Sequence, residues 1–345
     1  MLVLDPASNL ATPVFDELDT SDLTKPIQQL GMPTGLLANA DGRLDVVGWA
    51  SDNNHLLLAH TSSAGEEFIL YNRDNPTTSV NLSQLFKVST TKMELVNDKP
   101  DQVYIYNGST QALMVGDISN GNLSAANATK VIDFKALTSD QILYVGPSSQ
   151  SGMVDINLWD GSTNYKLATI KPSQHYFLDA AQFQGLWYYL VNSPSEGTVN
   201  IYKDPVQSIK DPAVGKAVPE VALVDNSLSH VSFSSNGRFA EVDNGKDFVV
   251  YDSEAKTRYK YSLASQLTGV TSWMDAYHFI GLSAGKVLIL DYDGTNQQLL
   301  LSANYPAGGL LSKDSKHLLT FSLDSANAQQ LTNVSLLAGV DQPAQ

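Results

Sequence analysis

The segment Phe248-Val249-Val250-Tyr251-Asp252 decides the fold, because its pattern returns along the chain roughly every 40 residues. The pattern joins an apolar run to an aromatic residue or Leu and then to Asp, Asn or Lys. Short apolar runs of this kind are typical of buried β-strands. The other copies are Phe68-Ile69-Leu70-Tyr71-Asn72, Val103-Tyr104-Ile105-Tyr106-Asn107, Ile156-Asn157-Leu158-Trp159-Asp160, Val199-Asn200-Ile201-Tyr202-Lys203 and Val287-Leu288-Ile289-Leu290-Asp291, with a partial copy at Leu2-Val3-Leu4-Asp5.

Each copy is expected to be one strand of a four-stranded unit. Dipeptides such as Asp160-Gly161 and Asp293-Gly294 follow the copies, and they readily adopt the positive φ angles of tight hairpin turns. A more polar strand comes next, as at 298–301, which suits an outer edge. Two further strands precede the copies, as at 231–234 and 239–242. A four-stranded unit repeated at this spacing predicts the blades of a β-propeller.

We therefore predict an all-β fold, a β-propeller of seven four-stranded blades that forms a single domain over residues 1–345. Six and eight blades are the alternatives, because Leu2–Asp5 is also consistent with the remnant of an upstream blade. Residues 1–43 form the lead-in, and Ala11–Phe15 is expected to join the three strands of the last blade and close the ring. The predicted blades cover residues 44–86, 92–132, 133–171, 175–225, 229–268, 270–304 and 307–338.

Two segments depart from the strand pattern. Residues 204–218 contain Pro205, Pro212 and Gly215, and we expect an insertion in the fourth blade there. Residues 20–30 predict a short helix with Thr20 or Ser21 as its cap.

The composition excludes several classes of function. The chain of 345 residues has a net charge of −15 and no basic run, so nucleic acid and anionic membranes are poor partners. It has no cysteine, which excludes disulfides, thiol catalysis and Cys-ligated zinc. No apolar run approaches the roughly 20 residues that span a bilayer. Residues 1–6 lack the basic and apolar segments of a signal peptide, and we expect a chain that begins inside a repeat.

One motif resembles a catalytic elbow. Gly281-Leu282-Ser283-Ala284-Gly285 has the G-x-S-x-G spacing of a nucleophile that lies on a strand-turn-helix and is followed by an acid and a His. Here two predicted strands flank the motif, and only His317 follows it. A glycine-rich β-turn is therefore the favoured interpretation.

A second motif resembles the start of a calcium loop. Asp291-Tyr292-Asp293-Gly294 supplies its first carboxylates, but Thr295 to Gln298 bring no further acidic ligand. Calcium loops need about six oxygen ligands and usually end in a Glu. A hairpin turn is favoured.

The histidines show no metal-binding spacing such as H-E-x-x-H. They lie far apart in the sequence, and His230, His278 and His317 border or enter apolar strands, where core or capping roles are expected. A propeller can still bring distant residues together at its axis. The six histidines are His55, His60, His175, His230, His278 and His317.

Four tryptophans, Trp49, Trp159, Trp187 and Trp273, form the candidate aromatic surface for a peptide or glycan. Trp49 and Trp273 fall on predicted inner strands and Trp159 on a buried type of strand, so burial is the expectation for these three.

The last third of the chain resembles the WD40-like repeat of TolB-type propellers. That repeat pairs an Asp-Gly-Thr-Asn turn with a later Ser-Pro-Asp-Gly-Lys turn. The first turn is matched by Asp293-Gly294-Thr295-Asn296. Lys313-Asp314-Ser315-Lys316 lacks the Pro and Gly of the second turn, whereas Ser234-Ser235-Asn236-Gly237-Arg238 is a closer copy.

Over most of its length the chain is similar to propeller regions of PEGA-domain proteins from ultrasmall, host-attached bacteria. The segments that carry this resemblance are 48–58, with Gly48-Trp49-Ala50-Ser51-Asp52, 182–188, with Gln182-Phe183-Gln184-Gly185, and the tail 337–343. Such proteins have an N-terminal membrane anchor and a PEGA module ahead of the propeller. The resemblance implies an extracytoplasmic setting at the cell surface, and it brings no catalytic residues.

These observations predict a non-enzymatic binding or scaffold module that recognises a protein or a glycan. We assign no catalytic, cofactor-binding or metal-binding residue and no cofactor from the sequence. A hydrolase or lyase with its site at the central channel is one alternative, and it predicts convergent carboxylates or a His with a shifted pKa. A structural spacer without a ligand is the other alternative.

Overall fold

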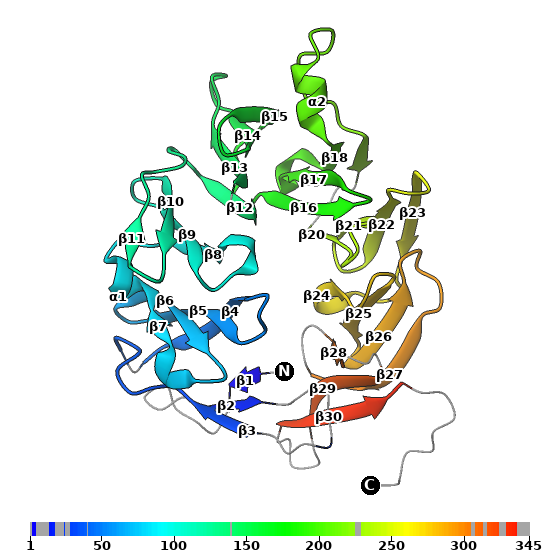
Figure 1. The fold of residues 1–345 in the computed structure, drawn as a ribbon. Helices are drawn as coiled ribbons and strands as arrows, with labels where there is room; N and C mark the ends of the chain where they lie inside the picture. Colours follow the sequence, from blue (N-terminus) through cyan, green and yellow to red (C-terminus); the bar gives the residue numbers. More distant parts are fainter. Residues whose placement is uncertain are drawn as a thin grey trace. The chain divides into compact units, whose positions relative to one another are not determined.

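The computed structural model describes residues 2–4, 14–17, 24, 28–39, 41–138, 140–224, 229–304, 308–312, 316–323 and 329–336. Within them the chain forms sheets of three or four consecutive strands (Figure 1). The chain divides into two compact units, Met1–Tyr165 and Lys166–Gln345, and the boundary falls within strand β15 (Asn164–Ile170).

The first unit contains one three-stranded sheet, β1 to β3, followed by the four-stranded sheets β4 to β7, β8 to β11 and β12 to β15, counted over the described residues. Their strands are β1 (Leu2–Leu4), β2 (Val14–Glu17), β3 (Gln28–Gly31), β4 (Arg43–Trp49), β5 (His55–Ser62), β6 (Gly65–Asn72), β7 (Val80–Asn81), β8 (Lys92–Leu95), β9 (Gln102–Asn107), β10 (Ala112–Asp117), β11 (Asn122–Leu123), β12 (Asp133–Thr138), β13 (Gln141–Pro147) and β14 (Val154–Trp159), with β15 as given above.

The second unit contains three four-stranded sheets, β16 to β19, β20 to β23 and β24 to β27, and the three-stranded sheet β28 to β30, again over the described residues. Their strands are β16 (Phe177–Phe183), β17 (Leu186–Asn192), β18 (Thr198–Lys203), β19 (Val221–Val224), β20 (His230–Phe233), β21 (Phe239–Asp243), β22 (Asp247–Asp252), β23 (Thr257–Ser262), β24 (Leu267–Trp273), β25 (His278–Ser283), β26 (Lys286–Asp291), β27 (Gln298–Ser302), β28 (Leu310–Leu311), β29 (His317–Leu323) and β30 (Gln329–Ser335).

These sheets confirm the predicted fold class, an all-β propeller; over the described residues six of the eight sheets have four strands and two have three. Five of the six sequence copies are the third strand of their sheet, but the copy at 103–107 is β9, the second strand. Helix α1 (Leu82–Phe86) lies between β7 and β8. The side chain of Asn81 caps this helix by accepting a hydrogen bond from the backbone N–H of Gln84 at 3.0 Å.

Two expectations about the N-terminal region were wrong where the structure describes it. Strand β2 contains Val14 and Phe15 of the expected closing strand, but it pairs with β1 on one edge and β3 on the other. Because both of its hydrogen-bonding edges are occupied, β2 cannot be the fourth strand of the sheet β28 to β30. The expected helix at 20–30 is also not formed at its end, since residues 28–30 belong to strand β3. Residues 11–13, 18–23 and 25–27 lie outside the described residues.

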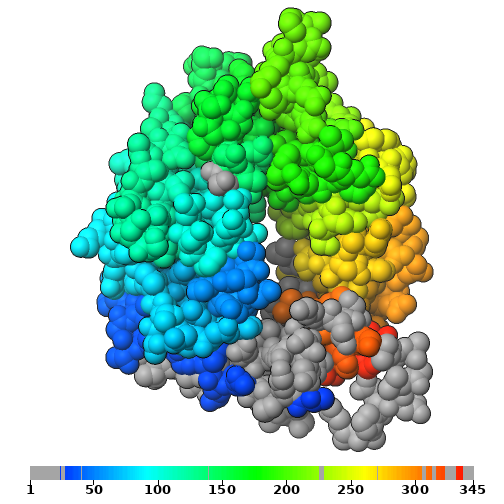
Figure 2. Space-filling model, viewed as in Figure 1, coloured from blue at the N-terminus to red at the C-terminus, as the bar shows by residue number. Residues whose placement is uncertain are grey.

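Helices are few among the described residues. Besides α1, helix α2 (Pro205–Lys210) lies in the expected insertion and has Pro205 at its first position, where the missing N–H costs no hydrogen bond. It projects outward from its sheet in Figures 1 and 2. Three short 3₁₀ helices span Pro76–Thr78, Val96–Asp98 and Pro194–Glu196. No helix in the described part of the chain is long and apolar enough to cross a membrane.

The sheets are buried on both faces, which explains the continuous apolar runs of the sequence copies. In β21, Ala240 and Val242 pack in the apolar cluster shared with β17 and β18, whereas Phe239 packs in the cluster shared with β25 and β26. Side chains of a strand alternate between faces, so Glu241 and Asp243 lie on the same face as Phe239. Two acidic residues are thus placed in the core face of an otherwise apolar strand.

Candidate functional site

The G-x-S-x-G segment is a hairpin between β25 and β26. Ser283 pairs with Lys286, and the two turn residues Ala284 and Gly285 have φ angles of 49° and 73°. Two consecutive positive φ angles are typical of a type I′ turn, which suits Gly. No helix follows the serine, so the β-turn interpretation is confirmed and the catalytic elbow is excluded.

The acidic segment at 291–294 is also a hairpin turn, between β26 and β27. Asn296 donates to the Asp291 carboxylate at 2.6 Å, and Thr295 donates to Asp293 from both its backbone N–H, at 3.0 Å, and its hydroxyl, at 2.6 Å. These carboxylates hold the turn itself, so the hairpin interpretation is confirmed.

Most of the described histidines pair with nearby polar groups in structural roles. His55 and His278 each contact an aspartate three residues earlier, Asp52 at 2.6 Å and Asp275 at 2.7 Å, and each aspartate also accepts hydrogen bonds from the turn backbone. His317 contacts Asn333, on β30, at 3.0 Å. The capping role expected of His278 is confirmed by these contacts.

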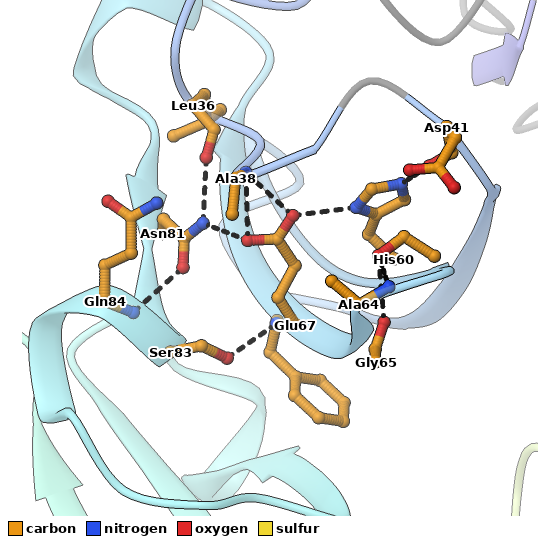
Figure 3. A network of polar contacts seen from close by, with 12 residues as sticks. Leu36, Ala38, Asp41, His60, Ala64, Gly65, Glu67, Asn81, Ser83 and Gln84 are labelled. Carbon is orange, nitrogen blue, oxygen red and sulfur yellow. Dashed lines mark hydrogen bonds and ion pairs between the residues drawn. The ribbon is translucent and has the colours of Figure 1, made fainter.

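His60 belongs to a buried polar network that ties the lead-in segment to the first four-stranded blade (Figure 3). Its Nδ1 lies 2.8 Å from Glu67 Oε1, and its Nε2 lies 2.7 Å from the carbonyl oxygen of Asp41. Glu67 also accepts hydrogen bonds from the backbone N–H of Ala38 and, through Oε2, from Asn81. Both carboxylate oxygens therefore have donors within the protein, as buried carboxylates require.

The four tryptophans differ in exposure and in packing. Trp49 is 38 % exposed, so the expected burial of this residue was wrong. Trp159 is half-buried against its blade core, and Trp187 stacks on Tyr189 at 6.0 Å. Trp273 is half-buried, with its ring 3.9 Å from Phe279.

The structure brings together one titratable cluster that the sequence analysis did not single out. His230 and Ser232 on β20 lie opposite Asp243 and Glu241 on β21, in antiparallel register. His230 Nδ1 is 3.1 Å from Asp243 Oδ2 and 3.5 Å from Glu241 Oε2. The Ser232 hydroxyl donates to Glu241 Oε2 at 2.9 Å and accepts from Trp273 Nε1 at 3.0 Å.

Burial and charge perturb all three titratable groups of this cluster. Although burial opposes the imidazolium, hydrogen bonds to Asp243 and Glu241 raise the pKa of His230 to about 10. Burial and the neighbouring Asp243 charge raise the pKa of Glu241 well above its usual value. Burial also opposes ionisation of Asp243, but hydrogen bonds from His230 and Glu241 outweigh it and lower the pKa of Asp243. The cluster thus joins a histidine and an acid with raised pKa values to an acid with a lowered pKa value.

A local signal for this cluster exists in the sequence. Glu241 and Asp243 are two residues apart in the strand Phe239-Ala240-Glu241-Val242-Asp243, which places both acids on one face. The pairing partner of that strand begins with His230. His230 lies on an apolar strand as expected, but its side chain is 30 % exposed and its neighbours are acidic rather than apolar.

A second feature lies on strand β4, an edge strand of the sheet β4 to β7. Val46, Val47 and Trp49 are 53 %, 41 % and 38 % exposed. The register shifts there: Val46 pairs with Leu58 and Gly48 pairs with Leu57, so Val47 is the extra residue of a bulge. We call Val46, Val47 and Trp49 the β4 strip.

No protein-family model and no curated protein matches the chain, whereas solved structures match in fold. The Dos1 propeller gives a TM-score of 0.52 at 13 % identity, covering 92 % of this chain and 85 % of that chain. A prolyl endopeptidase gives 0.53 at 13 % identity, covering 85 % of this chain and 47 % of that chain, so this chain spans about half of its length. The Swd1 β-propeller domain of Myceliophteria thermophila gives 0.49 at 15 % identity, covering 84 % and 96 %.

At these identities the likeness shows the fold alone. It supports the β-propeller fold that the sequence predicts. The finer resemblance to PEGA-domain proteins stays a prediction.

Proposed function

We propose that the chain is a non-enzymatic binding module that recognises a protein partner through the β4 strip. The observation that carries this proposal is the exposure of three large apolar side chains within four consecutive residues of one strand. Single exposed apolar residues are ordinary on protein surfaces, but contiguous ones mark interaction sites.

The backbone of β4 fits an extended partner segment. Because β4 is at the edge of its sheet, one of its sides carries backbone groups that no strand of that sheet uses. Peptides bind such edges by adding a strand, with pockets or patches for alternate side chains. The bulge at Val47 limits how far another copy of β4 could pair with it in register.

Charge favours a basic partner segment. The chain carries a net charge of −15, and Asp45 immediately precedes the strip. Burial, followed by the charge of Asp45, raises the pKa of Glu66, so these two acidic groups repel one another. A cation on the partner would relieve that repulsion, although Arg43 already contacts Asp45 at 2.8 Å.

Two synthetic peptides test the proposal, an extended peptide of alternating Leu and Lys and its counterpart with Glu in place of Lys. We expect the wild-type chain to bind the Lys peptide more tightly in fluorescence anisotropy, with binding that weakens at high salt. Val47→Asp and Trp49→Ala should each weaken binding at least tenfold. Leu299→Asp is the control, because Leu299 is 56 % exposed on β27, outside the strip.

Three outcomes would overturn this proposal. One is equal binding by wild type, V47D and W49A. Another is a wild-type dimer that V47D converts to a monomer in light scattering, since a second copy would then cover the strip. The third is a glycan array in which W49A abolishes binding while neither peptide binds.

The alternative of a hydrolase or lyase is favoured by one observation, the convergence of His230, Glu241 and Asp243 with perturbed pKa values. A catalytic group has to reach a substrate atom. Glu241 and Asp243 are 0 % and 2 % exposed, which leaves His230 as the one member of the trio with appreciable solvent contact. Turnover of ester or polysaccharide substrates that His230→Gln abolishes would establish the enzyme in place of the binding module.

The cellular setting is part of the proposal. Its support is the resemblance of segments 48–58 and 182–188 to propellers of envelope proteins. Protease treatment of intact cells that express the native gene, followed by detection with an antibody, tests it. Degradation in intact cells is expected, and protection until lysis would contradict the surface location. Absence of any partner in the binding assays would instead favour a spacer.

A further inference from the structure

We propose that His230, Glu241 and Asp243 bind a divalent transition-metal ion, Zn²⁺ or Mn²⁺, that links strands β20 and β21. This site is independent of the β4 strip and of the proposed binding function. Its imidazole nitrogen and two carboxylate oxygens are ligands that both ions accept.

The distances between the three groups fit a single ion. One ligand atom from each residue lies within 4.8 Å of the others. His230 Nδ1 is 3.1 Å from Asp243 Oδ2 and 3.5 Å from Glu241 Oε2. Ligands bound at about 2.1 Å in octahedral or tetrahedral geometry are about 3.0 to 3.4 Å apart. The cluster therefore needs little rearrangement to close around an ion.

A second observation points to a ligand. Glu241 is fully buried, and its Oε1 has no hydrogen-bond partner among the described residues. Buried polar atoms in native proteins nearly always have a partner, and one that has none requires an explanation. Glu67, the other carboxylate beside a buried histidine, has donors on both oxygens. Coordination of an ion would supply what Glu241 Oε1 lacks.

The neighbouring hydrogen bonds hold the carboxylates in place, as in known metal sites. Trp273 donates to Ser232, which in turn donates to Glu241 Oε2. The backbone N–H of Gly245 donates to Asp243 Oδ1 at 2.5 Å, which leaves Oδ2 directed at His230. The side chain of His230 is 30 % exposed and gives an ion its route from solvent.

The charges of the ligands suit a divalent ion. Metal ligands bind in their deprotonated forms, so the ion would be held by two carboxylates, which balance its charge, and by a neutral imidazole, and no redox change occurs.

Among the described residues, the other titratable group whose pKa this cluster shifts is Tyr261 on β23. Burial, and then the charges of Glu241 and Asp243, raise its pKa far above neutrality, so it stays protonated throughout. From β24 the cluster contacts Trp273, which is uncharged.

The test is isothermal titration of the tag-free, EDTA-treated full chain with ZnCl₂ and, separately, MnCl₂. We expect one ion per chain. The ion should also raise the melting temperature of the chain.

Variants separate this site from surface binding. His230→Gln and Asp243→Asn should each weaken binding more than tenfold, and Ser232→Ala by about tenfold because it frees Glu241. His278→Gln is the matched control. His278 also lies near two aspartates, but Asp275 and Asp291 contact opposite ring nitrogens and cannot share an ion with it. Circular dichroism establishes that each variant is folded.

Several results would overturn the site: no binding by wild type, or binding of several ions that H230Q leaves unchanged. Loss of binding in H278Q but not in H230Q would show that the ion binds at His278 instead. Should D243N fail to fold, H230Q at the more exposed position still decides the question.

Discussion

The protonation of the buried cluster on β20 and β21 predicts an unequal effect of two isosteric substitutions. Asp243→Asn removes a charge that the His230 imidazolium needs, whereas Glu241→Gln replaces an acid whose raised pKa favours its neutral form by a neutral amide of the same shape. In the presence of EDTA and at pH 7, D243N should therefore destabilise the chain much more than E241Q.

The magnitude follows from the pKa of His230, which is about 10 in the folded chain against 6.5 for free histidine. Forcing the imidazole to lose its proton at pH 7 costs about 1.4 kcal/mol per pH unit over three units, or about 4 kcal/mol. Keeping an uncompensated buried cation costs about 3 to 5 kcal/mol. Because His230 is 30 % exposed and partly screened by water, we expect about 2 to 4 kcal/mol for D243N. E241Q keeps an acceptor for Ser232 and should lower the free energy of unfolding by about 1 kcal/mol or less.

Urea unfolding followed by far-UV circular dichroism measures both values. The double variant H230Q/D243N should be less destabilised than the sum of its single variants, because the two groups contact each other. Equal destabilisation by D243N and E241Q, or a larger effect of E241Q, would show that Glu241 carries the charge and refute the reasoning.

Three further predictions follow from single contacts. In EDTA, the contribution of His230 to the stability of the wild type should be full below pH 6.5 and be lost as the pH rises toward 10, because the folded chain retains the His230 proton that the unfolded chain releases. H230Q should therefore flatten the melting-temperature profile between pH 6.5 and pH 10. Glu67→Gln should lower the free energy of unfolding by about 1 to 3 kcal/mol and accelerate hydrogen exchange of the Ala38 amide, measured by mass spectrometry. Unchanged exchange would contradict the network of Figure 3. Gly237→Ala should lower the free energy of unfolding in urea more than Gly185→Ala does. Both glycines have positive φ, but only a Cβ at Gly237 would lie 2.3 Å from the carbonyl oxygen of Gln182. Equal losses of stability would exclude this clash.

The architecture was predictable because its determinants are local. A strand buried on both faces needs a continuous apolar run, and a hairpin needs residues that tolerate positive φ. Segments such as 248–252 and 287–291 carry the first signal, and Asp293-Gly294 carries the second. Because the pattern recurs along the chain, several weak local signals together indicate a repeated blade.

The errors of prediction fall where pairing is not local. The sequence of Val14–Glu17 does not indicate whether this strand pairs with β1 and β3 or with a sheet distant in sequence. Residues 28–30 were assigned to a helix from composition alone, yet they pair with β2. The bulge at Val47 depends on the register between β4 and β5, which alternation does not reveal.

The buried clusters show the same division between local pattern and chain pairing. A histidine beside an acid on an apolar strand occurs twice, as His60 with Glu67 and as His230 with Glu241 and Asp243. The sequence does not separate them, because what distinguishes them is the supply of donors from elsewhere. The lead-in segment brings the Ala38 amide to Glu67, which completes that carboxylate within the protein. In the described part of the chain no donor reaches Oε1 of Glu241. Two clusters of similar composition therefore have different chemistry: the first is satisfied internally and holds a segment in place, whereas the second keeps an unused acceptor where a cation would be held.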